Sequence, residues 1–369
     1  MSFEKPAVVI DNGSYNIKAG FACDNHPVSI FRTVVGRPDY LHGSYGRQSY
    51  DVYIGDDAVS KIEDLELNKP VEKGRIVHWD NMERIWHHVF YKELKVAPED
   101  RAVVLACTTT SPMEEKIKCC EIFFETLNVP ALCIQPQAVL AVYGSGYTTG
   151  ISVDLGYDTT EVTPVYQGGR IEYAHTETRL AGSQVSEYLK LQLEERGIDL
   201  GVNTATVIEN IKRDCLYVTK DASMSRSDYE KYHRTADGDM VHVCREAFLA
   251  AELIFQPDLV MGQKTDFLPL PDAVVNAALV CDAELRPDLY DAIVLCGGLA
   301  MIPGLQERLA MEVENLTQTP VNVIGSPEAY AVAWLGGATF AGLPDAKKMW
   351  VTKKQFEEYG EKIVRNKFL

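Results

Sequence analysis

The sequence predicts an α/β protein built from two similar lobes around a shared ligand. Three observations lead to this fold class: a strand–turn–strand pattern that occurs twice, helical periodicity between the two occurrences, and a Gly-Gly turn after a further apolar strand. Alternating strands and helices are typical of α/β architecture. A pattern that occurs twice indicates a duplicated unit, so we expect each lobe to offer one glycine turn to a ligand in the cleft.

The repeated pattern is an apolar strand that ends in an Asp-x-Gly turn and is followed by further strands. It occurs over residues 7–21 and again over residues 151–174, where we expect a third strand at 170–174. Because glycine permits positive φ and carries no Cβ, such a turn can point backbone N–H groups at a phosphate. One turn alone is more often a tight hairpin, but two suit a polyphosphate held from both sides.

Amphipathic helices are expected between and after the two copies. Asp80 and Glu83 resemble a capping box, so we expect the first helix to begin at Asp80. Apolar residues recur at three- and four-residue steps over residues 80–94, 113–127 and 185–193. Stretches rich in polar residues predict loops over residues 37–51 and 220–239.

Two carboxylates mark the ends of the repeated strands. Asp11 and Asp154 each follow an apolar run, where a carboxylate is costly to bury unless it binds a cation or several donors. Together they would suit Mg²⁺, which keeps several waters and is contacted through few carboxylates. Lys18 follows Ser14 by four residues, and we expect it to reach a phosphate oxygen.

A third element joins an apolar strand at 293–295 to a helix through Gly297 and Gly298. A lone Gly-Gly turn is usually only a helix entry. Here the two glycines would let a flat base or a ribose lie against the backbone.

Composition excludes several classes of protein. The formal net charge of −17 disfavours direct binding to nucleic acid. Nine cysteines occur without a CxxC pair, which indicates reduced thiols in an intracellular compartment. We expect no leader segment and no membrane span, because no apolar run approaches about 18 residues.

The chain resembles the actin, sugar-kinase and heat-shock-chaperone ATPase superfamily, and within it the actins and actin-related proteins. The three elements above carry the superfamily resemblance. Actin-like segments then extend over nearly the full chain, at residues 35–38, 79–83, 85–88, 124–130, 137–140, 180–182, 255–257 and 349–353.

This resemblance implies a duplicated actin-like, ribonuclease H-like ATPase fold with two lobes and four subdomains around a nucleotide cleft. The implied subdomain 1 comprises residues 1–32, 70–144 and 331–369, and subdomain 2 comprises 33–69. Subdomain 3 comprises 145–180 and 263–330, and subdomain 4 comprises 181–262.

The resemblance also implies a binding site for ATP or ADP with Mg²⁺ or Ca²⁺. Phosphates would be held by Gly13, Ser14, Tyr15, Lys18, Gly156, Tyr157 and Asp158. Asp11, Gln137 and Asp154 would surround the metal, mainly through water. The adenosine would be lined by Gly182, Lys212, Arg213, Gly297, Gly298, Met301, Ile302 and Tyr330.

The implied catalytic residues are Gln137, Asp154 and Glu161. In the family, the residue matching Gln137 orients the attacking water with help from a histidine, and Glu161 takes that histidine's place. A second carboxylate beside Asp154 adds negative charge near the phosphates, so we expect slow hydrolysis. Tyr15 and Asp158 also depart from the family's glycine-rich phosphate loops.

The resemblance leaves two functional hypotheses open. The first is a cytoplasmic, cytoskeletal protein that self-associates into filaments or caps them. Its other partners would be proteins of the actin-binding type. The alternative is a nucleotide-bound subunit of a fixed complex of the minifilament, nucleator or chromatin-remodelling type, for which a nuclear location is also open. A metabolic kinase is disfavoured, because actin-like segments occur at both ends of the chain.

Overall fold

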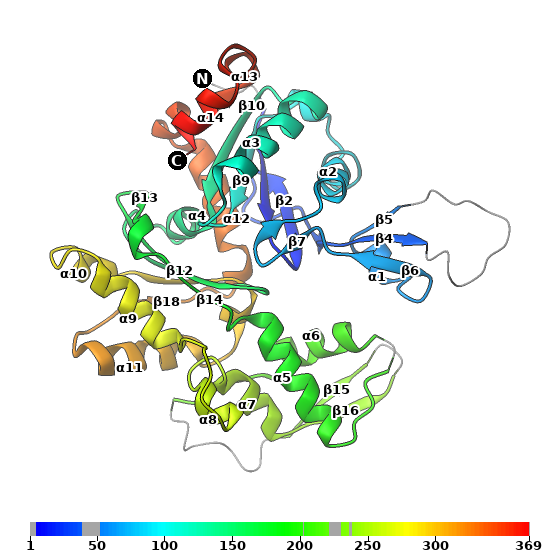
Figure 1. Cartoon of the computed structure of the whole chain (residues 1–369), viewed down its shortest axis with the longest axis vertical. Helices are drawn as coiled ribbons and strands as arrows, with labels where there is room; N and C mark the ends of the chain where they lie inside the picture. The colour runs from blue at the N-terminus through cyan, green and yellow to red at the C-terminus, as the bar shows by residue number, and fades with distance from the viewer. Residues whose placement is uncertain (1–4, 39–51, 202, 221–229, 236–237, 369) are drawn as a thin grey trace. The chain divides into compact units, whose positions relative to one another are not determined.

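The computed structural model describes residues 5–38, 52–201, 203–220, 230–235 and 238–368. The chain folds into two compact units (Figure 1). The first unit comprises residues 1–146 and 331–369, and the second comprises residues 147–330. Each unit has its own hydrophobic core. The finer division into four subdomains stays a prediction.

The first unit is built on a six-stranded sheet in the order β19-β10-β9-β1-β2-β3. Its strands are β1 (Val8–Asn12), β2 (Asn16–Phe21), β3 (Ser29–Arg32), β9 (Val103–Cys107), β10 (Ala131–Pro136) and β19 (Val351–Thr352). Smaller sheets are formed by β4 (Val35–Pro38), β5 (Tyr53–Ile54) and β6 (Leu65–Asn68), and by β7 (Val71–Glu72) and β8 (Arg75–Ile76).

Helices complete the first unit. They are α1 (Asp56–Val59), α2 (Trp79–His88), α3 (Met113–Glu121), α4 (Gln137–Gly144), α12 (Val332–Gly342), α13 (Lys353–Tyr359) and α14 (Glu361–Lys367). Short 3₁₀ turns occur at Pro98–Asp100 and Asp345–Lys348. The core contains the fully buried rings of Trp86, Phe90 and Phe123 from this helical layer.

The second unit contains a sheet in the order β13-β12-β11-β17-β18, with β14 beside β12. The strands are β11 (Gly150–Leu155), β12 (Thr160–Tyr166), β13 (Gly169–Arg170), β14 (Thr176–Thr178), β17 (Ile293–Cys296) and β18 (Val323–Ile324). A separate hairpin consists of β15 (Lys231–Arg234) and β16 (Met240–Val243).

The helices of the second unit are α5 (Gly182–Glu195), α6 (Thr204–Cys215), α7 (Arg245–Glu252), α8 (Pro257–Met261), α9 (Leu270–Val280), α10 (Arg286–Tyr290) and α11 (Leu305–Thr317). Shorter 3₁₀ turns occur at Glu172–Ala174 and Gly298–Met301, and another, Ala329–Ala331, spans the boundary of the two units.

The predicted internal repeat is present in the strand order. In the first unit the antiparallel strands β3, β2 and β1 are followed by the parallel strands β9 and β10. In the second unit β13, β12 and β11 are followed in the same way by β17 and β18. The two Asp-x-Gly turns therefore occupy equivalent places, between the first two strands of each unit.

The structure corrects two local expectations. The strand expected at 170–174 ends at Arg170, because Glu172–Ala174 forms a 3₁₀ turn. The expected capping box is wrong, since α2 begins one residue earlier and has no side-chain cap. The helices expected over 80–94 and 113–127 are present, and both end in π-helical turns, at Val89–Glu93 and Ile122–Thr126.

The loop expectations are tested only in part. Residues 39–51, 221–229 and 236–237 lie outside the described residues. Arg37 and Pro38 belong to β4, and Lys231–Arg234 forms β15. The loop expectation is therefore wrong at these positions, because a surface hairpin tolerates polar side chains wherever its backbone groups are paired.

Candidate functional site

In the first unit, the candidate site is centred on Asp11 near the end of β1. Asp11 is 1% exposed. One carboxylate oxygen accepts a hydrogen bond from Lys18 Nζ at 2.6 Å, and the other accepts one from Gln137 Nε2 at 2.6 Å. A buried carboxylate needs such partners to offset its lost hydration. The structure thus brings together three residues that the sequence assigned to metal and phosphate binding.

Local strand pairing explains this arrangement. Lys18 is the register partner of Asp11 in the β1–β2 hairpin, so the two side chains lie on the same face of the sheet. Gln137 is the first residue of α4, which begins directly after β10. Gln137 is 126 positions from Asp11 in the sequence and reaches it from the start of a helix.

The turn after Asp11 is shaped by its backbone. A Cβ on Gly13 would lie 2.5 Å from the carbonyl oxygen of Asn16, so a larger side chain would displace the turn. Thr33 Oγ1 donates to the Gly13 carbonyl at 2.7 Å. Tyr15 lies in the same turn with the Arg32 guanidinium 3.7 Å from its ring centroid. Ser14 and Tyr15 are both half-buried, and they lie in the hairpin that also carries Lys18.

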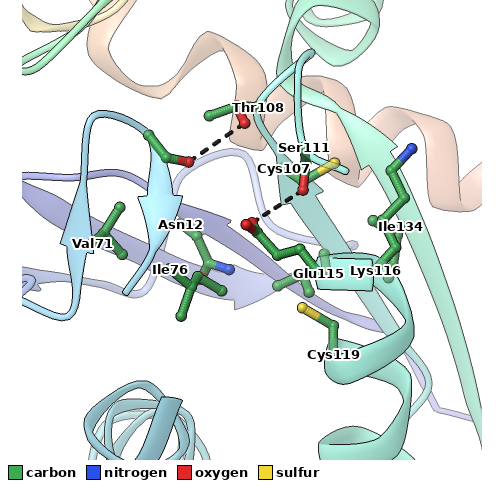
Figure 2. A pocket seen from close by; sticks show the side chains of 12 residues that line it. Asn12, Val71, Ile76, Cys107, Thr108, Ser111, Glu115, Lys116, Cys119 and Ile134 are labelled. Carbon is green, nitrogen blue, oxygen red and sulfur yellow. Dashed lines mark hydrogen bonds between the residues drawn. The ribbon is translucent and has the colours of Figure 1, made fainter. Parts of the chain in front are cut away.

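A small pocket lies beside this turn, within the first unit (Figure 2). Its lining includes Asn12, the residue that follows Asp11. Thr108 Oγ1 donates to the Gly74 carbonyl at 3.4 Å, and Ser111 Oγ donates to Glu115 at 3.0 Å. The cavity volume of about 20 Å³ has room for water rather than for an organic substrate.

In the second unit, Asp154 and Glu161 form the corresponding acidic centre. They are register partners in the β11–β12 hairpin. Glu161 is in turn opposite Glu177 on β14. Directly opposed residues share one face of a sheet, so three carboxylates lie on one face of three neighbouring strands. Asp154 is half-buried and Glu161 is 7% exposed, and such a face favours cations.

The loop after Asp154 is held against the start of α5. The Gly182 N–H donates to the Gly156 carbonyl at 3.0 Å, and the Ser183 N–H donates to the Tyr157 carbonyl at 2.7 Å. Two predicted segments, 156–158 and the turn around Gly182, are therefore adjacent. Asp158 is half-buried in the same loop.

Lys212 extends this cluster from α6. Its Nζ donates to the Gly182 carbonyl at 3.0 Å and to Ser186 Oγ at 2.8 Å, and it is 2.7 Å from a Glu209 carboxylate oxygen. Nζ also lies 5.4 Å from the centroid of the Tyr157 ring. Lys212 is therefore held by several partners and lies beside Gly182 and Tyr157, two other residues predicted for nucleotide binding.

Sequence reasoning missed the two side chains that hold Lys212. Glu209 precedes Lys212 by three residues on one helix, a spacing typical of an ion pair, so this signal was present. Ser186 gave no such signal.

Arg213 was predicted beside Lys212. Its side chain is 69% exposed and paired with Asp214, so the structure separates it from the contacts of Lys212.

The Gly-Gly turn lies against the end of β11. Gly297 has φ of 91°, and a Cβ there would lie 2.4 Å from the Leu155 carbonyl oxygen and 2.7 Å from Asp154 Oδ1. The Gly297 N–H donates to the Ala329 carbonyl at 3.0 Å, which brings the segment before Tyr330 to the same turn. Only glycine fits this close approach.

The other predicted adenosine residues surround this turn. Gly298 faces open space, since a Cβ there would meet no atom within 4 Å. Met301 is 39% exposed, whereas Ile302 is 8% exposed. Tyr330 is half-buried. An exposed glycine beside a partly exposed apolar side chain can accept a flat ring.

The two units therefore carry different sets of polar groups. The first holds a carboxylate between an ammonium and an amide, which is a donor set that suits phosphate oxygens and a hydrated divalent cation. The second offers paired carboxylates, a lysine and a close backbone turn. Among the described residues, no group of three His, Cys, Asp or Glu side chains is arranged to hold a metal directly. No helix in the described part of the chain is long and apolar enough to cross a membrane.

Comparison with known families gives one extensive match. The family model described as Actin matches residues 2–205 and residues 200–369. These two segments together extend over nearly the whole chain, in agreement with the resemblance that the dispersed motifs indicated.

Proposed function

This chain belongs to the actin family, and from that premise we propose that it binds ATP or ADP and couples the nucleotide to assembly into, or capping of, filaments. The observation that carries the nucleotide proposal is Asp11, held between Lys18 and Gln137 at 2.6 Å each. A lysine, a carboxylate and an amide beside a glycine turn are groups that suit a metal-bound polyphosphate.

We assign the phosphates to the two Asp-x-Gly turns. Gly13, Ser14 and Tyr15 would present backbone N–H groups from the first unit, with Lys18 as the neutralising charge. Gly156, Tyr157 and Asp158 would do so from the second unit. A bound Mg²⁺ or Ca²⁺ would supply charge neutralisation of the phosphate oxygens, and Asp11, Gln137 and Asp154 would orient its waters.

The adenosine would contact residues of the second unit. Lys212 is held in place by Glu209 and Ser186, so it would present a fixed side chain to the adenosine. The open backbone at Gly298 and the exposed Met301 would face the base or ribose. Gly182, Gly297, Ile302 and Tyr330 would complete the lining, and Arg213 would approach from the solvent side.

Hydrolysis in this proposal is slow. Gln137 would orient the attacking water, and Glu161 would accept its proton. Because Glu161 is opposite Asp154, the second carboxylate adds negative charge where phosphate charge develops. This opposes the attack.

The same acidic pair favours a second candidate function. A subunit that holds ATP without hydrolysing it would serve as a fixed component of a larger actin-like complex. Glu161 supports this alternative, because it stands where the family has a histidine that, when neutral, assists the attacking water.

One experiment separates the two candidates. Purified protein with Mg²⁺ and ATP would be sedimented at high speed while phosphate release is followed in the same sample. A pellet that forms only with ATP and releases phosphate supports assembly coupled to hydrolysis. Soluble protein that retains ATP without releasing phosphate supports the fixed subunit.

A variant provides the control. Asp11→Asn keeps the size of the side chain and removes the charge that pairs with Lys18. We expect it to weaken retention of ATP in both candidates. If wild-type protein fails to retain labelled ATP, or Asp11→Asn retains it equally well, the assignment of this site is wrong.

A further inference from the structure

A cysteine and a histidine lie within hydrogen-bonding distance in the second unit, away from the residues proposed for nucleotide binding. His242 is on β16, and Cys244 directly precedes α7 (Figure 1). The Cys244 Sγ is 3.3 Å from His242 Nε2. A thiol with an imidazole this close has a base that can accept its proton.

The imidazole is held in place from two sides. Its ring stacks on the Tyr232 ring, with centroids 4.6 Å apart and planes 9° apart. A Glu230 carboxylate oxygen is 3.6 Å from Nε2. The His242 carbonyl accepts a hydrogen bond from Arg196 at 3.2 Å. The ring stacking and the strand pairing of β16 with β15 keep the imidazole beside the sulfur.

The backbone places Cys244 at the start of a helix. Cys244 is the N-terminal cap of α7, an eight-residue helix, and the positive end of the helix dipole stabilises an anion there. The Cys244 side chain is partly exposed. Glu246 accepts a hydrogen bond from the Cys244 N–H at 3.0 Å, which fixes the position of the residue at the helix start.

Six other thiols lack this combination. Burial raises the pKa of Cys119, Cys120, Cys133, Cys215 and Cys281, so their thiols stay protonated. Cys23 is exposed, and its sulfur is 3.6 Å from an Asp24 carboxylate oxygen. Cys23 is therefore an internal control that is more accessible and has a carboxylate, not an imidazole, beside its sulfur.

We infer that Cys244 is a modification site for low-molecular-weight disulfides of the glutathione disulfide class, with His242 as its base. His242 Nε2 takes the thiol proton, and the Cys244 thiolate attacks one sulfur of the disulfide. The reagent's S–S bond breaks as the new S–S bond to Cys244 forms. The departing thiolate then takes the proton from His242, so one disulfide is exchanged for another.

The test is the rate of modification of each cysteine by glutathione disulfide at pH 7, followed by mass spectrometry of peptides. We expect Cys244 to react about tenfold faster than Cys23 in the wild-type protein. Equal or faster reaction at Cys23 would overturn the inference. This comparison requires no substitution, so it remains decisive even where a variant unfolds.

Two variants then assign the role of the imidazole. His242→Gln retains a polar side chain that cannot accept the proton, and we expect the Cys244 rate to fall about tenfold while the Cys23 rate stays unchanged. His87→Gln is the matched control, because His87 is also partly exposed and lies 3.9 Å from a carboxylate oxygen, that of Glu83. An unchanged Cys244 rate in His242→Gln would contradict the role of His242.

Discussion

Glu161 on β12 lies directly opposite Asp154 on β11, so two carboxylates share one face of the sheet in the second unit. The family residue at the Glu161 position is a histidine, according to the resemblance given by the sequence. The repulsion between like charges opposes the build-up of further negative charge in the same place. The consequence for hydrolysis can be measured directly.

We predict that Glu161→His increases phosphate release from ATP. Removing one negative charge near the reacting phosphate is worth about 1.4 kcal/mol, or about tenfold in rate. The measurement is single-turnover phosphate release with Mg²⁺ and saturating ATP. Glu177→Gln is the control, because it removes an exposed charge one strand further away and should change the rate less. Equal effects of the two substitutions would mean that only net charge matters.

The Asp11–Lys18 pair gives a second prediction, on stability. Lys18→Met removes the cation from a carboxylate whose side chain is 2% exposed, and an uncompensated buried charge costs about 3 kcal/mol. We expect the free energy of unfolding, measured by urea denaturation without nucleotide, to fall by about 3 kcal/mol. The amide of Gln137 remains as a partial partner.

The double variant provides the control for this prediction. Asp11→Asn together with Lys18→Met removes both charges, so most of the lost stability should return. A double variant as unstable as Lys18→Met alone would show that the lysine stabilises the unit through its packing and not through its charge.

The sequence predicted the two hairpins because each is local. Apolar strands with Asp-x-Gly turns form from neighbouring residues, and the register that joins Asp11 to Lys18 follows from the turn. The contact of Gln137 with Asp11 came only from the family resemblance, because it depends on where α4 begins. The partners of Lys212 lie on α5 and α6. No local pattern indicates Ser186, since its position depends on how two helices pack.

Two predictions of local boundaries, a helix cap and the end of a strand, were wrong. The expected cap at Asp80 is absent because α2 begins at Trp79. The expected strand at 170–174 ends early. Only Ala174 is buried in the segment Glu172–Ala174, so the segment lacks the alternation of buried and exposed side chains that lets a strand pack on a core. Both errors concern boundaries, which tertiary contacts decide.

A third prediction concerns the Gly-Gly turn. Gly297→Ala places a Cβ 2.4 Å from a carbonyl oxygen at φ of 91°, and we expect a loss of about 2 kcal/mol in the free energy of unfolding. Gly298→Ala is a matched control, since its Cβ would meet open space. Its effect on stability should be small, whereas any effect on nucleotide binding would place the base beside Gly298. Equal destabilisation by the two substitutions would contradict the close approach.

The fourth prediction is a pH dependence from His175 in the second unit. Its Nδ1 is 2.9 Å from Thr163 Oγ1, and its Nε2 is buried without a hydrogen-bond partner in the described residues. Burial, with a smaller effect of the Arg170 charge, lowers the pKa of His175 below its usual value of 6.5. The unfolded chain therefore binds a proton at this histidine more tightly than the folded chain does.

The direction of the pH dependence of stability follows from this difference in proton binding. Well above pH 6.5 neither state is protonated at His175, and its contribution to stability is fully present. As the pH falls below that value, the unfolded state takes up the proton first and the protein loses stability. We expect denaturation curves of wild-type protein to show this loss and those of His175→Gln to show less of it. The variant His87→Gln, at a partly exposed histidine, should behave like wild type. The same slope in His175→Gln as in wild type would assign the loss to other groups.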